Sequence, residues 1–217
     1  SIIYSVRLVS DGSGLPGWAR PILDGLLALN IDLAMDAVAI RLGMWDWGMG
    51  LERQYFGVPW ANFWAWFWVV SSFSAGLRLA DRWRHPAAPW LAPGAAVVIG
   101  LVGVLATNAL IVFVVPRALY ETTVALTLAA ALGLVAWQRP RFDRAPAEPP
   151  AVWVPLVSHL YFLAAGLLAG VFQAAPVLLA VSALMFAAAL GLHPSLWRPA
   201  LTRLAGPPKP GSGGSSS

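Results

Sequence analysis

Residues Ile31 to Trp68 read IDLAMDAVAIRLGMWDWGMGLERQYFGVPWANFWAWFW. The segment starts inside an apolar run that carries Asp32 and Asp36 one helical turn apart, crosses a Trp-rich turn, and enters a second apolar run after Pro59. Carboxylates, indoles and amides are concentrated here more than anywhere else in the chain. Because acids are costly in apolar surroundings, this segment is the first candidate for a functional site.

The composition is that of an integral membrane protein. Hydrophobic residues make up 59% of the 217 residues and charged residues only 11%, far from the balance of a soluble domain. The net charge of +4 does not indicate nucleic-acid binding, because the arginines lie in short segments between apolar runs, where orientation in a bilayer explains them. The absence of cysteine excludes disulfides and cysteine metal sites.

Six apolar runs meet or approach the length of about 20 residues that a spanning helix needs. They are residues 21–41, 60–79, 92–115, 117–138, 152–172 and 175–193. Backbone polar groups in lipid must be satisfied internally, and the alternation typical of membrane barrels is absent. The sequence therefore predicts an all-α polytopic helix bundle that forms a single domain over residues 1–205, followed by a flexible Gly/Ser-rich tail over 206–217.

The positive charges predict the orientation of this bundle. All of the 14 Lys and Arg residues except Arg41, Arg53 and Arg117 lie before the first run, between the second and third, between the fourth and fifth, or after the sixth. The positive-inside bias then places both termini in the cytoplasm. The first twenty residues lack a signal-peptide pattern, and we expect an N-terminal portion to be missing before Ser1.

The first run carries three acids on one side of the expected helix. Asp36 lies about 40° from Asp32 around the axis, and Asp24 lies about 80° from Asp32. A charge at the bilayer centre costs at least about 2.5–3.5 kcal/mol, so Asp32 must face a polar cavity, find a partner or stay protonated. The functional interpretation is a general acid. The alternative is that Asp36 pairs with Arg41, or that Asp32 only holds helices together.

Six of the twelve tryptophans lie between Trp45 and Trp68. A belt at the headgroup level explains Trp45, Trp47 and Trp60. It explains Trp64 and Trp68 less well, because they share one helix face deeper in the bilayer. Aromatic faces attract cations, so an inward wall of indoles could bind a conjugated polyene or shield a carbocation. Both interpretations remain open at this point.

The other isolated polar residues offer little chemistry. His159 stands alone in its apolar run, and no second histidine follows at metal-binding spacing. The chain has no phosphate-cradling glycine loop, nucleophile elbow or dinucleotide fingerprint. We therefore predict neither a metal site nor a cofactor.

Three motifs in order carry a resemblance to a known family. They are Asp32-Leu33-Ala34-Met35-Asp36, Gly43-Met44-Trp45-Asp46-Trp47 and Tyr55-Phe56-Gly57-Val58-Pro59-Trp60-Ala61-Asn62-Phe63-Trp64-Ala65-Trp66. Together they resemble the membrane carotenoid biosynthesis family that includes carotenoid 1,2-hydratases of the bacterioruberin and γ-carotene type. Ala37 departs from the family pattern, which has proline after the acid.

The resemblance implies an enzyme of a bacterial or archaeal cytoplasmic membrane that adds water across the terminal C1,2 double bond of a linear carotenoid. Such an enzyme needs proton delivery and water but no cofactor. The implied catalytic residues are Asp32 as proton donor, Asp36 tuning its acidity or orienting water, and Tyr55 and Asn62 as hydrogen-bonding partners. The predicted substrate-binding residues are Trp45, Trp47, Phe56, Trp64 and Trp68, which lie in or beside these motifs, and His159, which lies outside them.

A second hypothesis uses the same aromatic residues without turnover. In it, the chain is a pigment-binding or structural subunit of a photosynthetic membrane complex. The expected partners in either case are a carotenoid or other polyene, membrane lipids and possible partner subunits, but no nucleic acid. A transporter is the least favoured reading, because Pro116 and Pro176 lie at helix ends and do not interrupt helices in corresponding halves.

Overall fold

The described residues of the computed structural model, 2–142 and 148–193, form helices and no strand apart from an isolated bridge between Tyr55 and Val58. The predicted all-α class is therefore confirmed. The helices are α1 (Ile2–Gly12), α2 (Arg20–Arg41), α3 (Trp60–Ala80), α4 (Ala88–Ala109) with its π-helical extension η1 (Leu110–Val114), the short 3-10 helix η2 (Arg117–Leu119), α5 (Tyr120–Trp137), α6 (Pro149–Leu168), α7 (Val171–Ala174) and α8 (Pro176–Gly191). The predicted tail over 206–217 lies outside the described residues.

Each of the six apolar runs contains one of the long helices, with ends shifted by a few residues. In the described part of the chain, three helical segments are long and apolar enough to cross a membrane, namely Ala88–Val114, Arg117–Trp137 and Pro149–Leu168. Helix α8 is apolar but shorter. Helices α2 and α3 are equally long but are not among these three segments. Helix α1 was not predicted from the sequence.

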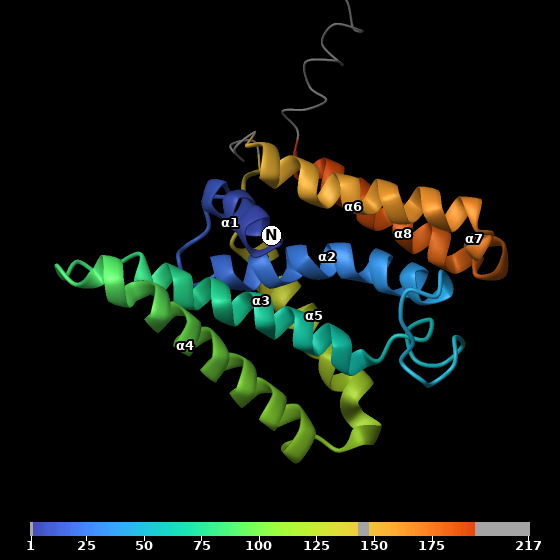
Figure 1. Cartoon of the computed structure of the whole chain (residues 1–217), viewed down its shortest axis with the longest axis horizontal. Helices are drawn as coiled ribbons and strands as arrows, with labels where there is room; N and C mark the ends of the chain where they lie inside the picture. The colour runs from blue at the N-terminus through green and yellow to red at the C-terminus, as the bar shows by residue number, and fades with distance from the viewer. Residues whose placement is uncertain (1, 143–147, 194–217) are drawn as a thin grey trace, which may run out of the picture.

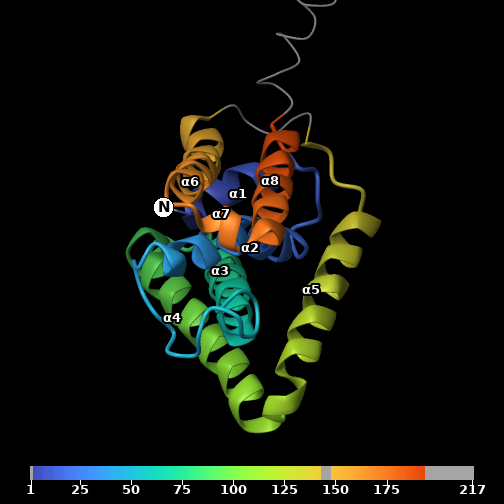
Figure 2. The same ribbon diagram turned by 90° about the vertical axis from the view of Figure 1, so that its right-hand side faces the viewer.

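Helix α2 is the central element of the fold (Figure 1). It packs against α1, α3, α5, α6 and α8, which surround it on several sides. The hairpin of α6 and α8 covers one side of α2, and α3 lies on the other. Helices α4 and α5 meet at their connection beyond α3 and separate toward α2 (Figure 2). The acids of α2 therefore face protein and not lipid, as their cost in lipid requires.

Small residues allow α3 and α4 to approach closely. A Cβ added to Gly76 would lie 2.5 Å from the carbonyl oxygen of Ala96, and one added to Gly100 would lie 2.6 Å from the ring of Phe73. A Cβ added to Gly103 would come equally close to the Ser72 side chain. The absence of side chains at these positions permits the close packing, and at Gly76 it allows contact with the backbone of the neighbouring helix.

The last two long helices form a hairpin. Helices α6 and α8 pack side by side, and the single turn of α7 joins them. Gly170 supplies the left-handed conformation that starts α7, with φ of +73°. Gly166 lies against Phe172 and Val38, so the hairpin packs tightly on α2.

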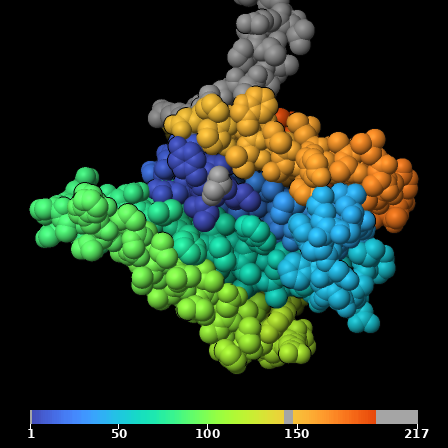
Figure 3. Space-filling view, in the orientation of Figure 1, coloured from blue at the N-terminus to red at the C-terminus, as the bar shows by residue number. Residues whose placement is uncertain are grey.

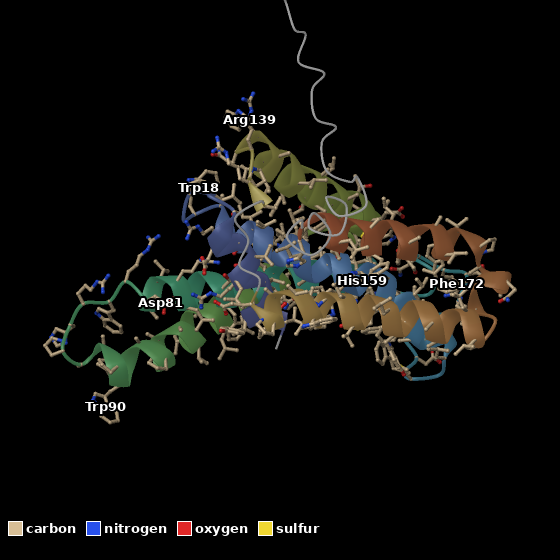
Figure 4. All side chains as sticks on the ribbon, turned by 90° about the horizontal axis from the view of Figure 1, so that it is seen from above. Trp18, Asp81, Trp90, Arg139, His159 and Phe172 are labelled. Atoms are coloured by element: carbon tan, nitrogen blue, oxygen red, sulfur yellow. The ribbon has the colours of Figure 1, made fainter. Side chains whose placement is uncertain are left out.

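The outer helices expose their large apolar side chains. Phe113, Leu168 and Trp90 are among the most exposed, and Trp90 points away from the ribbon in Figure 4. The connection between α3 and α4 projects from one end of the molecule (Figure 3). An apolar exterior around a polar central helix is the arrangement expected of a chain that lies in lipid.

Candidate functional site

The two central acids of α2 meet an amide from α3. Asn62, in the first turn of α3, donates from Nδ2 to Asp36 Oδ2 at 2.7 Å and to Asp32 Oδ2 at 3.2 Å. Both acids are almost fully buried, with exposed fractions of 2% for Asp32 and 3% for Asp36. Both carboxyl groups therefore share one amide donor, and the second oxygen of Asp32 has no hydrogen-bond partner among the described residues.

No basic side chain neutralises this pair in the described part of the chain. Arg41 follows Asp36 on the same helix, but its guanidinium donates to the backbone oxygens of Ala37, Phe56 and Leu51. It also lies over the ring of Phe56. The alternative in which Arg41 pairs with Asp36 is therefore wrong, because Arg41 fastens the loop after α2.

Hydrogen bonds order the second half of the loop between α2 and α3. Tyr55 and Val58 bond to each other through both backbone amides, and Gly57 makes the turn between them with φ of +90°. The Tyr55 hydroxyl donates to Leu33 O at 2.9 Å, so it anchors the loop to α2. Burial and, secondly, the Asp32 carboxylate raise the pKa of the Tyr55 phenol above its ordinary value. Tyr55 thus orders the start of α3, on which Asn62 lies, but among the described residues its hydroxyl bonds to neither acid.

A cavity of about 340 Å³ opens beside the acid pair. Its lining residues are Met35, Asp36, Trp45, Asp46, Trp47, Asn62 and Trp66. Trp45 and Trp47 are exposed in the loop, where Asp46 accepts a hydrogen bond from the Gly48 amide at 2.8 Å. The structure therefore brings Asp36, Asn62, Trp45 and Trp47 of the predicted set together around one space. Asp32 lies behind Asp36 and does not line the cavity.

Trp64 and Trp68 lie elsewhere on α3. Trp64 is buried and donates from Nε1 to Thr107 O of α4 at 3.0 Å, and its ring meets that of Trp68 edge-on. Trp66, on the side of α3 that carries Asn62, lines the cavity instead. The spacing predicted that Trp64 and Trp68 share a face, which they do, but sequence spacing alone does not tell which face turns toward the acids.

Phe56 and His159 also lie apart from the cavity. Phe56 packs against Tyr55 and Arg41 in the loop. The His159 ring lies 3.0 Å from Asn30 Oδ1, and the Asn30 amide in turn donates to Met185 O of α8. His159 on α6 and Phe172 on α7 both belong to the hairpin side of the molecule (Figure 4). These polar groups connect α2 to α6 and α8, which is the structural role that a lone buried histidine most often has.

A second polar cluster was not predicted. Arg78 of α3 donates to Asp24 Oδ2 at 3.0 Å and to the Ser10 hydroxyl at 2.7 Å, and it pairs with Asp11. Ser74 also donates to Asp24, which is fully buried. The sequence signal for this cluster was the expected antiparallel pairing of α2 with α3, because that pairing places the first turn of α2 beside the last turn of α3.

Comparison of the chain with protein-family models, with curated proteins and with solved structures found no match. Among residues 2–142 and 148–193, no group of three or more His, Cys, Asp or Glu side chains could hold a metal ion. The site is accordingly described by its own geometry, which is a buried carboxyl pair, one bridging amide and an indole-lined cavity.

Proposed function

We propose that the chain hydrates the terminal C1,2 double bond of a linear carotenoid, using the Asp32–Asp36 pair as the acid. The observation that carries the proposal is the position of Asp36. It belongs to a buried carboxyl pair with no cation beside it in the described chain, and it lines a cavity of about 340 Å³ walled by Trp45, Trp47 and Trp66. The sequence resemblance to carotenoid 1,2-hydratases points to the same reaction.

The chemistry assigns different roles to the two acids. A protonated Asp36 transfers its proton to C2 of the alkene, which forms a C–H bond and leaves a tertiary cation at C1. Indole faces beside the cavity stabilise that cation through their quadrupoles. Water then bonds to C1, and the proton that it loses returns to the Asp36 carboxylate. Asp32 shares the proton of the pair, and Asn62 holds both carboxyls in place.

The proposal revises one role expected from the sequence. Asp32 was expected to be the proton donor, with Asp36 tuning its acidity. Because Asp36 lines the cavity and Asp32 lies behind it, we assign proton delivery to Asp36 and the supporting role to Asp32. Asp46 lies at the exposed rim of the same cavity and receives no role in the reaction.

We also propose that the fold spans the membrane six times with both termini in the cytoplasm, in a bacterial or archaeal cytoplasmic membrane. The contacts support this arrangement. The Arg141 amide donates to Ser13 O, and Arg7 pairs with Asp81, so three arginine-bearing segments meet at one end of the bundle. At the other end, Gln54 and Arg117 line one cavity.

The test is product analysis in a host that makes a linear carotenoid. The wild-type chain should add the mass of one water to the pigment. Asp36→Asn should slow this by about a hundredfold or more, because general acid catalysis contributes about 10²–10⁴. Asp46→Asn is the matched control, since this acid lines the same cavity but is exposed, and it should retain the rate. A normal rate in Asp36→Asn would remove Asp36 from the mechanism.

Pigment binding without turnover is the second candidate, and the indole-lined cavity favours it equally. In that case the purified chain would carry a polyene absorption band, no hydrated product would form, and Asp36→Asn would keep the band. Trp66→Ala should then shift or weaken it, because Trp66 lines the cavity.

A further inference from the structure

A second cavity, of about 400 Å³, lies at the opposite end of α2 from Asp36. It is formed by the start of α2 and the second half of α3. Its walls are mainly apolar and include Trp18, Ile22, Trp68, Ala75 and Leu79. None of these residues takes part in the cavity beside Asp36. The hydratase proposal gives this space no role.

The apolar cavity continues into a cationic one. An adjoining cavity of about 320 Å³ shares Gly17, Arg78 and Arg82 with it. The adjoining cationic cavity is also lined by Arg7 and Arg20 and by the acids Asp11 and Asp81. An apolar chamber with arginines at its mouth has the polarity pattern of a molecule with an anionic head and an apolar tail.

Three of the four arginines are already paired. Arg7 pairs with Asp81, Arg20 with Asp11, and Arg78 with Asp11 and Asp24. Arg82 is the exception. Within the described residues its guanidinium has neither an ion pair nor a hydrogen bond, and it rests against the backbone of Gly17, where an added Cβ would lie 2.4 Å from Nη2. This leaves a full positive charge at the junction of the two cavities.

Two further features favour an anion at this junction. Helix α2 begins here, with Ala19 as its N-cap and no side-chain cap, so its first amide groups and its dipole present positive potential. Trp18 beside it is 57% exposed, as an indole anchored at the headgroup level would be.

We propose that this junction binds one anionic phospholipid, with the phosphate on Arg82 and an acyl chain in the apolar cavity. Guanidinium groups bind phosphate through parallel N–H bonds. The arginine-rich end of a membrane protein faces the cytoplasmic leaflet, whose surface is negative. The lipid would fill the space between α2 and α3 at the end that the proposed reaction leaves empty.

Native mass spectrometry of the full chain in detergent tests this, with phosphatidylglycerol and phosphatidylcholine as probes. Wild type should retain one phosphatidylglycerol at about tenfold lower lipid concentration than phosphatidylcholine. Arg82→Gln should remove that preference. Arg84→Gln is the matched control, because Arg84 lies two residues further along the same connection and lines neither cavity. It should keep the preference.

A third variant and a competitor separate the possible sources of the phosphate. Ala75→Phe fills the apolar cavity, so it should weaken retention of both lipids if an acyl chain occupies that space. Equal losses in Arg82→Gln and Arg84→Gln would overturn the proposal in favour of general surface charge. Displacement by inorganic phosphate together with normal retention in Ala75→Phe would overturn it in favour of a free-anion site.

Discussion

Asp24 and Asp36 lie about three turns apart on one helix and are accommodated in different ways. Asp24 has a cation, since Arg78 reaches it from α3. Among the described residues, Asp36 has no ion pair and shares the Asn62 amide with Asp32. An ion pair fixes its charges, whereas a carboxyl pair can gain and lose a proton. The difference separates a structural acid from one that is suited to chemistry.

Removing Arg78, the cation that pairs with Asp24, should therefore lower the free energy of unfolding. Arg78→Ala leaves Asp24 fully buried without its partner, and we expect a loss of about 3–5 kcal/mol in the free energy of unfolding. Arg7→Ala is the control, because the carboxylate of its partner Asp81 is 63% exposed, and it should cost about 0–1 kcal/mol. Thermal unfolding followed by circular dichroism measures both. Similar losses in the two variants would contradict a specific role for the buried pair.

Tyr55 should ionise late. The neutral phenol donates to Leu33 O, and burial raises its pKa above the ordinary tyrosine value of about 10. The stability that it contributes is thus complete below about pH 10 and is lost as the pH rises from there toward the folded pKa. The absorbance difference between wild type and Tyr55→Phe, followed through an alkaline titration, isolates this group. A midpoint at the ordinary value would show that the phenol is not held as described.

At the scale of elements, the sequence predicted the long helices well and their rotation poorly. Run length placed the six helices, because about 20 apolar residues have few other options in lipid. It missed α1, which is short and amphipathic. It also could not tell whether Trp64 or Trp66 would turn toward the acids, since that depends on how α3 rotates against α2. The Asp24–Arg78 pair was missed because the two residues are 54 positions apart.

The close approach of α3 and α4 depends on particular glycines. Gly76→Ala places a Cβ 2.5 Å from the Ala96 carbonyl oxygen, so the helices must separate, and we expect a loss of about 1–3 kcal/mol. Gly94→Ala is the matched change within α4, because no atom outside its own helix lies within 4 Å of the added Cβ. It should be neutral or stabilise by about 0.5–1 kcal/mol. The same thermal measurement compares them, and a tolerant Gly76 would contradict the close packing.

At the scale of the whole molecule, the absence of cysteine allows a direct test of the proposed topology. Single cysteines can replace Arg53, Arg84, Ala118 and Arg139 one at a time. Six spans predict that positions 53 and 118 react with an impermeant maleimide from outside the cell. Positions 84 and 139 should react only after the membrane is permeabilised. Labelling of positions 53 and 84 from the same side would show that α3 does not cross.

The central position of α2 also bears on how the protein is made. Its acids find their partners on α3, where Asn62, Ser74 and Arg78 lie, and those residues leave the ribosome only after α2 is complete. Alone, α2 would be a poor substrate for insertion. We therefore expect the translocon to retain α2 until α3 arrives and to release the two into the bilayer as one hairpin.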